Sequence, residues 1–195
     1  MLHKEHQGYM IMSKKIIALI LVLAFAFVGA LSAQDGESID KAQPSVFDIG
    51  LIMNYSYANI QAREFSAYVP TLRFQWNALP WLGISATGYS RGQEYAALVV
   101  EAVLRAPLGL IEPYVATGPG ILFAFTDDVP ASGTSNFAYN FRAGFDINIT
   151  DWFSIGPGIT LLIPDVRHFF GNIETLDIEY LKETSLIGIG AKLRF

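Results

Sequence analysis

The feature that most constrains the fold is an alternation of apolar residues with polar or small ones, which begins near residue 46 and continues to the C-terminus. A period of two residues is the pattern of β-strands whose two faces meet different environments. The alternation falls into eight segments: 46–57, 65–76, 81–90, 95–106, 111–125, 137–148, 153–163 and 184–195. The apolar phase continues through all eight segments, so one whole face of the predicted sheet is apolar.

The connections between these segments alternate between tight turns and longer, more polar loops. The tight turns are at 77–80, 107–109 and 150–151, and the other connections are 58–64, 91–94, 126–136 and 164–183. A segment of about ten residues is long enough for a tilted strand to cross a bilayer. This layout predicts an all-β fold, an eight-stranded antiparallel up-and-down transmembrane β-barrel with both termini on the short-turn side.

The tryptophans support a membrane location. Trp76, Trp81 and Trp152 all flank short turns, where an aromatic girdle at the membrane interface would place them. The competing interpretation is a soluble β-barrel or sandwich, whose strands also alternate. Its outward face would need Lys, Glu and Thr, yet only 16% of this chain is charged, against about a quarter in soluble proteins.

Composition also excludes several classes of function. The chain is 52% hydrophobic, which excludes intrinsic disorder, and it has no cysteine, which excludes a disulfide or zinc scaffold. Thirteen Lys and Arg against eighteen Asp and Glu leave no basic surface for nucleic acid. No cofactor or metal site is predicted.

The first 33 residues are predicted to be a secretory signal peptide. Lys14 and Lys15 precede an uncharged run of sixteen residues at 16–31, and small residues follow it. The alternative is an anchoring helix, but this run is shorter than the roughly 20 residues that span a bilayer. Cleavage is expected after Ala33, with Ala30 as the second choice.

Three further boundaries follow from the same region of the chain. Residues 1–11 do not resemble the start of a signal peptide, whereas the segment from Met12 does, so 1–11 are expected to be a mis-assigned start. Residues 34–45 are polar and rich in turn formers, which predicts a flexible leader. The transmembrane barrel is then expected at 46–195.

Four prolines fall inside the predicted strands, namely Pro70, Pro113, Pro119 and Pro157. Proline has no N–H to donate to the strand ladder, and in sheets it is found at edges, strand starts or bulges. A closed barrel has no edge. We therefore expect bulges or strand-end positions at these four residues.

Two segments resemble a known family. The last strand reads GIGAKLRF over 188–195, and the segment 113–120 reads PYVATGPG, with Ala116 where glycine is usual. Both are similar to the small eight-stranded outer-membrane barrels of Gram-negative-type bacteria, of the OmpA, OmpX and OmpW type, and the resemblance covers residues 46–195. It implies a protein of the bacterial outer membrane, in contact with outer-membrane lipid. An OmpA-like peptidoglycan-binding domain is not expected.

The resemblance also implies an assembly signal. In these families the terminal aromatic strand resembles the signal that the barrel-assembly machinery reads. The corresponding residues here are Phe195 and Leu193.

The polar phase of the strands places charged side chains inside the predicted barrel. Five are cationic and three are anionic: Asp48, Arg73, Glu101, Arg105, Arg142, Asp146, Lys192 and Arg194. A barrel of eight strands is only wide enough to be filled by its own side chains, and charges in so small a space must pair. We therefore expect a filled lumen in which inward glycines make room for long arginines. The alternative is a narrow pore that favours anions or is gated.

Enzyme activity is not expected. His168 is the one histidine of the predicted mature chain, and it lies beside Asp165 and Arg167 in the last long loop. Outer-membrane lipid deacylases use a Ser–His–acid site, but their His-x-Ser spacing is absent here. Asp127 and Asp128 could, with His168, imitate an outer-membrane protease, but those barrels have ten strands and far longer chains.

Two functions therefore remain open. One is a structural or interaction role, in which loops 126–136 and 164–183 bind an extracellular ligand. The other is a narrow channel or transporter for small or hydrophobic molecules, as in OmpW-like barrels, with a passage opening sideways into the lipid at the strand prolines.

Overall fold

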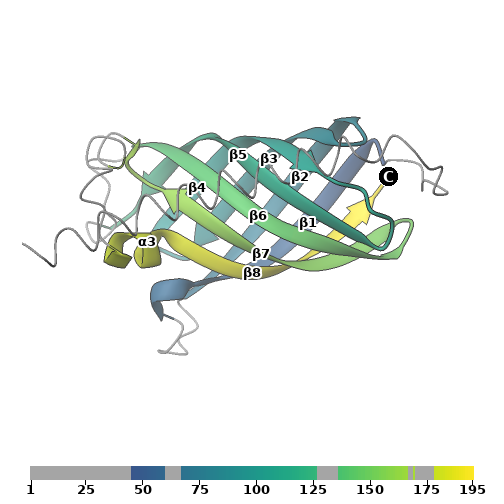
Figure 1. Ribbon diagram of the computed structural model, residues 1–195. Helices are drawn as coiled ribbons and strands as arrows, with labels where there is room; N and C mark the ends of the chain where they lie inside the picture. The colour runs from purple at the N-terminus through teal and green to yellow at the C-terminus, as the bar shows by residue number, and fades with distance from the viewer. Residues whose placement is uncertain (1–44, 60–66, 127–135, 167–168, 170–177) are drawn as a thin grey trace, which may run out of the picture.

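The computed structural model describes residues 45–59, 67–126, 136–166, 169 and 178–195 of the chain. Eight antiparallel strands close into one barrel in the order β1 to β8 (Figure 1). The strands are β1 (Phe47–Ser56), β2 (Tyr68–Leu79), β3 (Leu82–Arg91), β4 (Tyr95–Arg105), β5 (Ile111–Ala124), β6 (Asn136–Thr150), β7 (Phe153–Ile163) and β8 (Ser185–Arg194). Two helical segments, η1 (Tyr57–Asn59) and α3 (Ile178–Thr184), lie at the long-loop end. The predicted fold class is confirmed.

The pairing of β1 with β8 closes the barrel, and it runs without a register shift. Beyond the strands, the Phe195 carbonyl accepts hydrogen bonds from the backbone N–H groups of Val46 (2.7 Å) and Phe47 (3.2 Å). The Phe195 N–H in turn donates to the Phe47 carbonyl at 2.8 Å. Each strand thus has two partners, and the C-terminus lies at the end of the barrel opposite α3 (Figure 1). The predicted signal peptide and residues 34–44 of the leader lie outside the described residues.

Successive side chains of each strand face opposite sides of the wall, as the alternation predicts. In β1 the burial changes at every residue, from exposed Phe47 to buried Asp48 and onward. Large apolar side chains on the outer face are exposed, and some by more than half, such as Leu98 (56%), Val100 (53%) and Ile189 (60%). An apolar belt that surrounds a barrel is suited to hydrocarbon rather than to water.

Aromatic side chains mark both ends of this apolar belt. Trp76, Trp81 and Trp152 are exposed near the short turns. At the long-loop end the exposed aromatic side chains include Tyr57, Tyr68, Phe125 and Phe137. Two aromatic girdles around an apolar band are typical of barrels that cross a membrane.

Among the described residues, no helix is both long enough and apolar enough to cross a membrane.

The structure corrects several details of the predicted elements. β2 occupies Tyr68–Leu79 rather than 65–76, so the turn expected at 77–80 is shorter than predicted. The helix α3 (Ile178–Thr184) occupies the end of the segment 164–183, which was expected to be a loop, and the first residue of the predicted strand 184–195. Ile163, which has the apolar and so lipid-facing phase of the predicted segment 153–163, is instead fully buried at the long-loop end of β7, the strand against which α3 packs.

The prolines divide into two pairs. Pro70 lies beyond the last residue pair between β2 and β3, and Pro113 lies beyond the last pair between β4 and β5. These two occupy ladder ends, as expected. Pro119 and Pro157 lie well inside β5 and β7, where no register shift occurs, so the expected bulges are absent there.

Each of these inner prolines is the centre of a Gly-Pro-Gly sequence. Pro119 pairs with Tyr139 of β6, but toward β4 the pairing is interrupted at Gly118 and Pro119. A Cβ on Gly118 would collide with the carbonyl oxygen of Val100 on β4. The two backbones are therefore in close contact at the point where proline cannot donate a ladder hydrogen bond.

The second Gly-Pro-Gly sequence repeats this arrangement. Pro157 pairs with Ile189 of β8, and the pairing toward β6 is interrupted at Gly156 and Pro157. A Cβ on Gly156 would collide with the carbonyl oxygen of Phe145. At both interruptions, close packing of glycine against the neighbouring backbone keeps the wall shut.

The outer face provides a test of membrane depth. Val100→Arg, at the middle of β4, should reduce the free energy of unfolding by about 2–4 kcal/mol, because the charge would face hydrocarbon. Leu110→Arg, at an exposed turn position, should reduce it by about 0–1 kcal/mol. Urea unfolding in lipid vesicles measures both. Equal losses would contradict the assignment of the apolar belt to the bilayer.

The Gly-Pro-Gly sequences give a second test. Gly118→Ala should destabilise the barrel by about 1–3 kcal/mol or more, because the new methyl group cannot fit against the β4 backbone. Gly88→Ala is the matched control, since its Cβ would meet no atom closer than 4.0 Å. Urea unfolding in micelles compares the two variants, and a Gly118→Ala variant as stable as Gly88→Ala would contradict the close contact.

Candidate functional site: the interior of the barrel

The charged side chains predicted for the lumen lie inside the barrel in two groups. Toward the short-turn end lie Asp48, Arg105, Asp146, Lys192 and Arg194, and nearer the middle lie Arg73, Glu101 and Arg142. All are buried except Arg194, whose side chain is 10% exposed. We call the first group, with Glu112, the inner ion-pair network and the second the central cluster.

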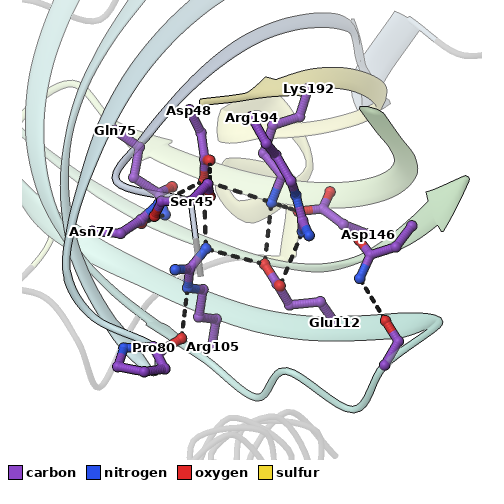
Figure 2. A network of polar contacts seen from close by, with 12 residues as sticks. Ser45, Asp48, Gln75, Asn77, Pro80, Arg105, Glu112, Asp146, Lys192 and Arg194 are labelled. Carbon is purple, nitrogen blue, oxygen red and sulfur yellow. Dashed lines mark hydrogen bonds and ion pairs between the residues drawn. The ribbon is translucent and has the colours of Figure 1, made fainter. Parts of the chain in front are cut away.

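Glu112 of β5 is the centre of the inner ion-pair network (Figure 2). One of its carboxylate oxygens lies 3.1 Å from Lys192 Nζ and 3.5 Å from Arg105 Nη1, and the other lies 2.9 Å from Arg194 Nη2. Lys192 also contacts Asp146, at 2.6 Å. The three cations come from β4 and β8, so this network ties together strands that are not neighbours.

Asp48 extends the network to the opposite wall of the barrel. Its carboxylate accepts hydrogen bonds from Ser45 Oγ (2.5 Å) and Asn77 Nδ2 (3.0 Å), and it lies 3.4 Å from Arg105 Nη1. Arg105 Nε donates to the Pro80 carbonyl at 2.9 Å. Figure 2 shows these side chains directed toward one another across the short-turn end.

Glu101 of β4 organises the central cluster. It receives hydrogen bonds from Ser85 (2.9 Å) and Thr87 (2.5 Å) of β3 and from Asn140 Nδ2 (2.6 Å) of β6. Arg142 Nη2 lies 2.9 Å from the same carboxylate. A buried carboxylate with four partners has its charge and its lone pairs satisfied, which a buried ion requires.

Tyr114 fills the space between the charged side chains. The guanidinium carbons of Arg73 and Arg142 lie 5.6 Å and 5.4 Å from the centre of its ring. A Cβ at Gly144 or Gly158 would lie within 2.8 Å of the Tyr114 hydroxyl. Inward glycines thus make room for a tyrosine here, in addition to the arginines expected from sequence.

The long-loop half of the lumen holds an apolar cluster beside buried polar side chains such as Asn54, Ser56 and Thr71. Buried apolar side chains from seven strands pack together there, and we call them the outer apolar layer: Val69, Tyr89, Tyr95, Ala97, Val99, Leu122, Ala138, Leu162 and Leu186. Proceeding from the short turns, the lumen therefore holds ion pairs, then the Glu101 cluster, then apolar side chains.

Sequence reasoning missed two of these features. Glu112 has the same inward phase as Tyr114, so the alternation could have identified it. The outer apolar layer was missed because apolar residues in the polar phase, such as Val99 and Leu122, carry no signal of their own. The fourth carboxylate brings the interior to five cations and four anions.

Little of the long-loop end is described. Phe169 packs near Tyr180 of α3, with 6.3 Å between the ring centres. Burial raises the pKa of Tyr180 to about 12, and the charges of Asp165 and Glu183 add to the rise. His168, Asp127 and Asp128 lie outside the described residues. Within the described ranges, no group of three or more His, Cys, Asp or Glu residues could hold a metal ion.

Comparisons with known proteins place the fold. No protein-family model matches the chain, and no curated protein matches it in sequence. The N-terminal β-barrel domain of Pseudomonas aeruginosa OprF is similar in structure, with a TM-score of 0.56, 13% identity, and 78% of this chain and 98% of that chain covered. A de novo designed transmembrane β-barrel matches with a TM-score of 0.50, 12% identity and coverage of 78% and 98%. The outer membrane protein OprG from Pseudomonas aeruginosa matches with a TM-score of 0.49 and 10% identity, and the match covers 81% of this chain and 99% of that chain.

At these identities the likeness concerns the fold. A closed ladder of eight strands, an apolar outer belt with aromatic girdles and a charged interior together define a transmembrane β-barrel. The fold is that of the small bacterial outer-membrane barrels.

The central cluster can be tested by a double-mutant cycle. Glu101→Leu should destabilise the barrel by about 3–5 kcal/mol, because it leaves the buried charge of Arg142 unpaired. Adding Arg142→Met should recover much of this loss, since both charges are then removed. Urea unfolding in micelles measures the four proteins of the cycle. Additive losses would show that the two residues do not stabilise each other.

Proposed function

We propose that this outer-membrane barrel has a structural or loop-mediated interaction role and does not conduct. The observation that carries the proposal is the burial of the interior charges. Seven of the eight side chains predicted to form the lumen charge network are at most 5% exposed. A water-filled pore would leave such side chains accessible to solvent, and an eight-stranded barrel is narrow enough for them to fill it.

Two of the three layers in the lumen, the inner ion-pair network and the outer apolar layer, block it in different ways. The inner ion-pair network spans the short-turn end, from Asp48 on β1 to Glu112 on β5. The outer apolar layer obstructs the other end without any charge that would attract an ion. An ion crossing the barrel would have to displace both layers, and the side chains of each are held by contacts with several strands.

The alternative is a narrow channel that opens sideways into the lipid at the strand prolines. The close backbone contacts at Gly118 and Gly156 count against it, because neighbouring strands pack closely where such an opening was expected. A passage there would require separating β4 from β5 or β6 from β7.

The long-loop end is the proposed site of interaction with an extracellular ligand. The loops 126–136 and 164–183 supply it, and α3 forms part of the second loop. The neighbours named above are not described as enzymes, and we propose no catalytic residue.

Phe195 and Leu193 are proposed to form the signal read by the barrel-assembly machinery. Both side chains are exposed on the outer face at the short-turn end. The backbone of Phe195 also closes the ladder against Val46 and Phe47. The last residue thus combines a structural contact with a side chain that remains free to be recognised.

Conductance tests the main proposal. The folded protein in a planar lipid bilayer should produce no stepwise current, because no water-filled path crosses the two layers. Insertion is checked on the same preparation by the faster migration of unheated protein in SDS gels. Regular single-channel steps from the wild-type barrel would favour the channel function instead.

Removal of the last residue tests the assembly signal. Deletion of Phe195 should still allow folding from urea into micelles, yet the protein should reach the outer membrane of cells poorly. Phe195→Ala is the matched variant, because it keeps the backbone hydrogen bonds to Val46 and Phe47 and removes only the ring. Normal surface levels of both variants would remove the role of this ring in assembly.

A further inference from the structure

The outer face of β3 carries unusually small side chains across the apolar belt. After Ile84, its outward residues are Ala86, Gly88 and Ser90. A Cβ at Gly88 would meet no atom closer than 4.0 Å, so the space above this glycine is open. Small residues at successive outward positions of one strand leave a depression in the belt.

The two neighbouring strands carry large side chains beside this depression. Ala86 is paired with Phe74 of β2 on one side and with Val100 of β4 on the other. The next outward position of β3 is paired with Leu72 and Leu98 in the same way. These four large side chains are 46–56% exposed and form two ridges with β3 as the floor between them. Because β2 and β4 are two strand spacings apart, this β3 groove is roughly 10 Å wide between the backbones.

Toward the short-turn end the β3 groove opens into a hollow of about 390 Å³. The hollow reaches from β1 to β4, and every side chain that faces outward in it is aliphatic or aromatic. They include Phe47, Ile49, Phe74, Trp76, Ala86 and Val100. A concave apolar surface of this size is within the range of sites that bind small ligands.

The position of the β3 groove identifies hydrocarbon as its occupant. It is continuous with the belt that faces the bilayer, so the molecules that can reach it are lipids and other membrane proteins. Trp76 and Trp81 mark the membrane interface at the short turn, so the hollow begins beside the level of the lipid head groups. A second copy of the barrel is convex, and its wall would rest on the two ridges without reaching the floor. A single flexible acyl chain can follow the floor and contact both ridges.

We propose that the β3 groove holds one acyl chain of a phospholipid from the leaflet on the short-turn side. The chain extends from the hollow beside Trp76 over Ala86 toward Gly88. Tryptophan at this level is suited to contact both the chain and the polar ester groups of the lipid. Contacts along two ridges and a floor add many small dispersion attractions, so this lipid exchanges more slowly than the other lipids around the barrel. The groove lies on the outside of the wall, and the site is therefore independent of whether the lumen conducts.

Phospholipid brominated on its acyl chains, which quenches tryptophan on contact, is the probe for the first experiment. Two variants are folded into detergent micelles, one that keeps only Trp76 and one that keeps only Trp152, with phenylalanine at the other tryptophan positions. Quenching of Trp76 should reach half its maximum at a lower mole fraction of the lipid. The reason is that the groove retains a chain, whereas Trp152, which does not line the hollow, meets the average composition of the micelle. Identical quenching curves would overturn the proposal.

Filling the floor of the β3 groove is the second experiment. Ala86→Leu, added to the variant that keeps Trp76, should move its quenching curve to that of Trp152, because the larger side chain occupies the path of the acyl chain. Ala143→Leu is the matched control, at an exposed outward alanine of β6 that does not line the hollow, and it should leave the curve unchanged. Faster migration of the unheated proteins in SDS gels confirms that both variants fold. A curve that Ala86→Leu does not move would overturn the proposal.

Native mass spectrometry in the same detergent identifies the occupant. The wild-type barrel should be released as a monomer that carries one phospholipid, and Ala86→Leu should lose the lipid-bound peak while Ala143→Leu keeps it. A wild-type dimer that Ala86→Leu dissociates would assign the groove to a second copy of the chain and overturn the proposal.

Discussion

The ladder between β1 and β8 is the contact on which the rest of the structure depends. In hydrocarbon a backbone N–H or C=O without a partner costs several kcal/mol, so strands can cross a membrane only when the last one pairs with the first. Here the pairing runs from Asp48 opposite Arg194 to Ser56 opposite Leu186 without a register shift. Closure after eight strands also sets the width of the barrel, and that width leaves the interior to side chains rather than to water.

The contents of the interior follow from this narrow width. Charges confined there must find partners, and Glu112 and Glu101 collect most of the cations into two groups. Glycines at 144 and 158 leave the space that Tyr114 occupies between those groups. Apolar residues such as Val99 and Leu122 fill the remaining length. The same side chains that satisfy the buried charges also fill the lumen, and the proposed structural or loop-mediated role rests on that filling.

The alternation predicted much of the fold, because a two-residue period follows directly from a wall with lipid on one side. Details that depend on contacts between distant strands could not be predicted. The pairing of Glu101 with Arg142 joins β4 to β6, and nothing local to either residue specifies it. Pro119 was expected at a bulge or a strand end, but close packing of Gly118 against β4 accommodates it inside the strand. Glu112 could have been predicted, because it has the inward phase of the alternation in β5. The alternation carries no signal for the helix α3, which lies where the alternation ends.

The filled lumen is tested most directly by thiol accessibility, since the chain has no cysteine of its own. Ser154→Cys, near the short-turn end, and Ala97→Cys, in the outer apolar layer, place thiols at buried interior positions. Gln93→Cys places one on an exposed turn. A membrane-impermeant thiol reagent applied from both sides of lipid vesicles should label Gln93→Cys rapidly and leave both interior cysteines unlabelled. Labelling of Ser154→Cys or Ala97→Cys at a rate close to that of Gln93→Cys would contradict a closed, filled barrel.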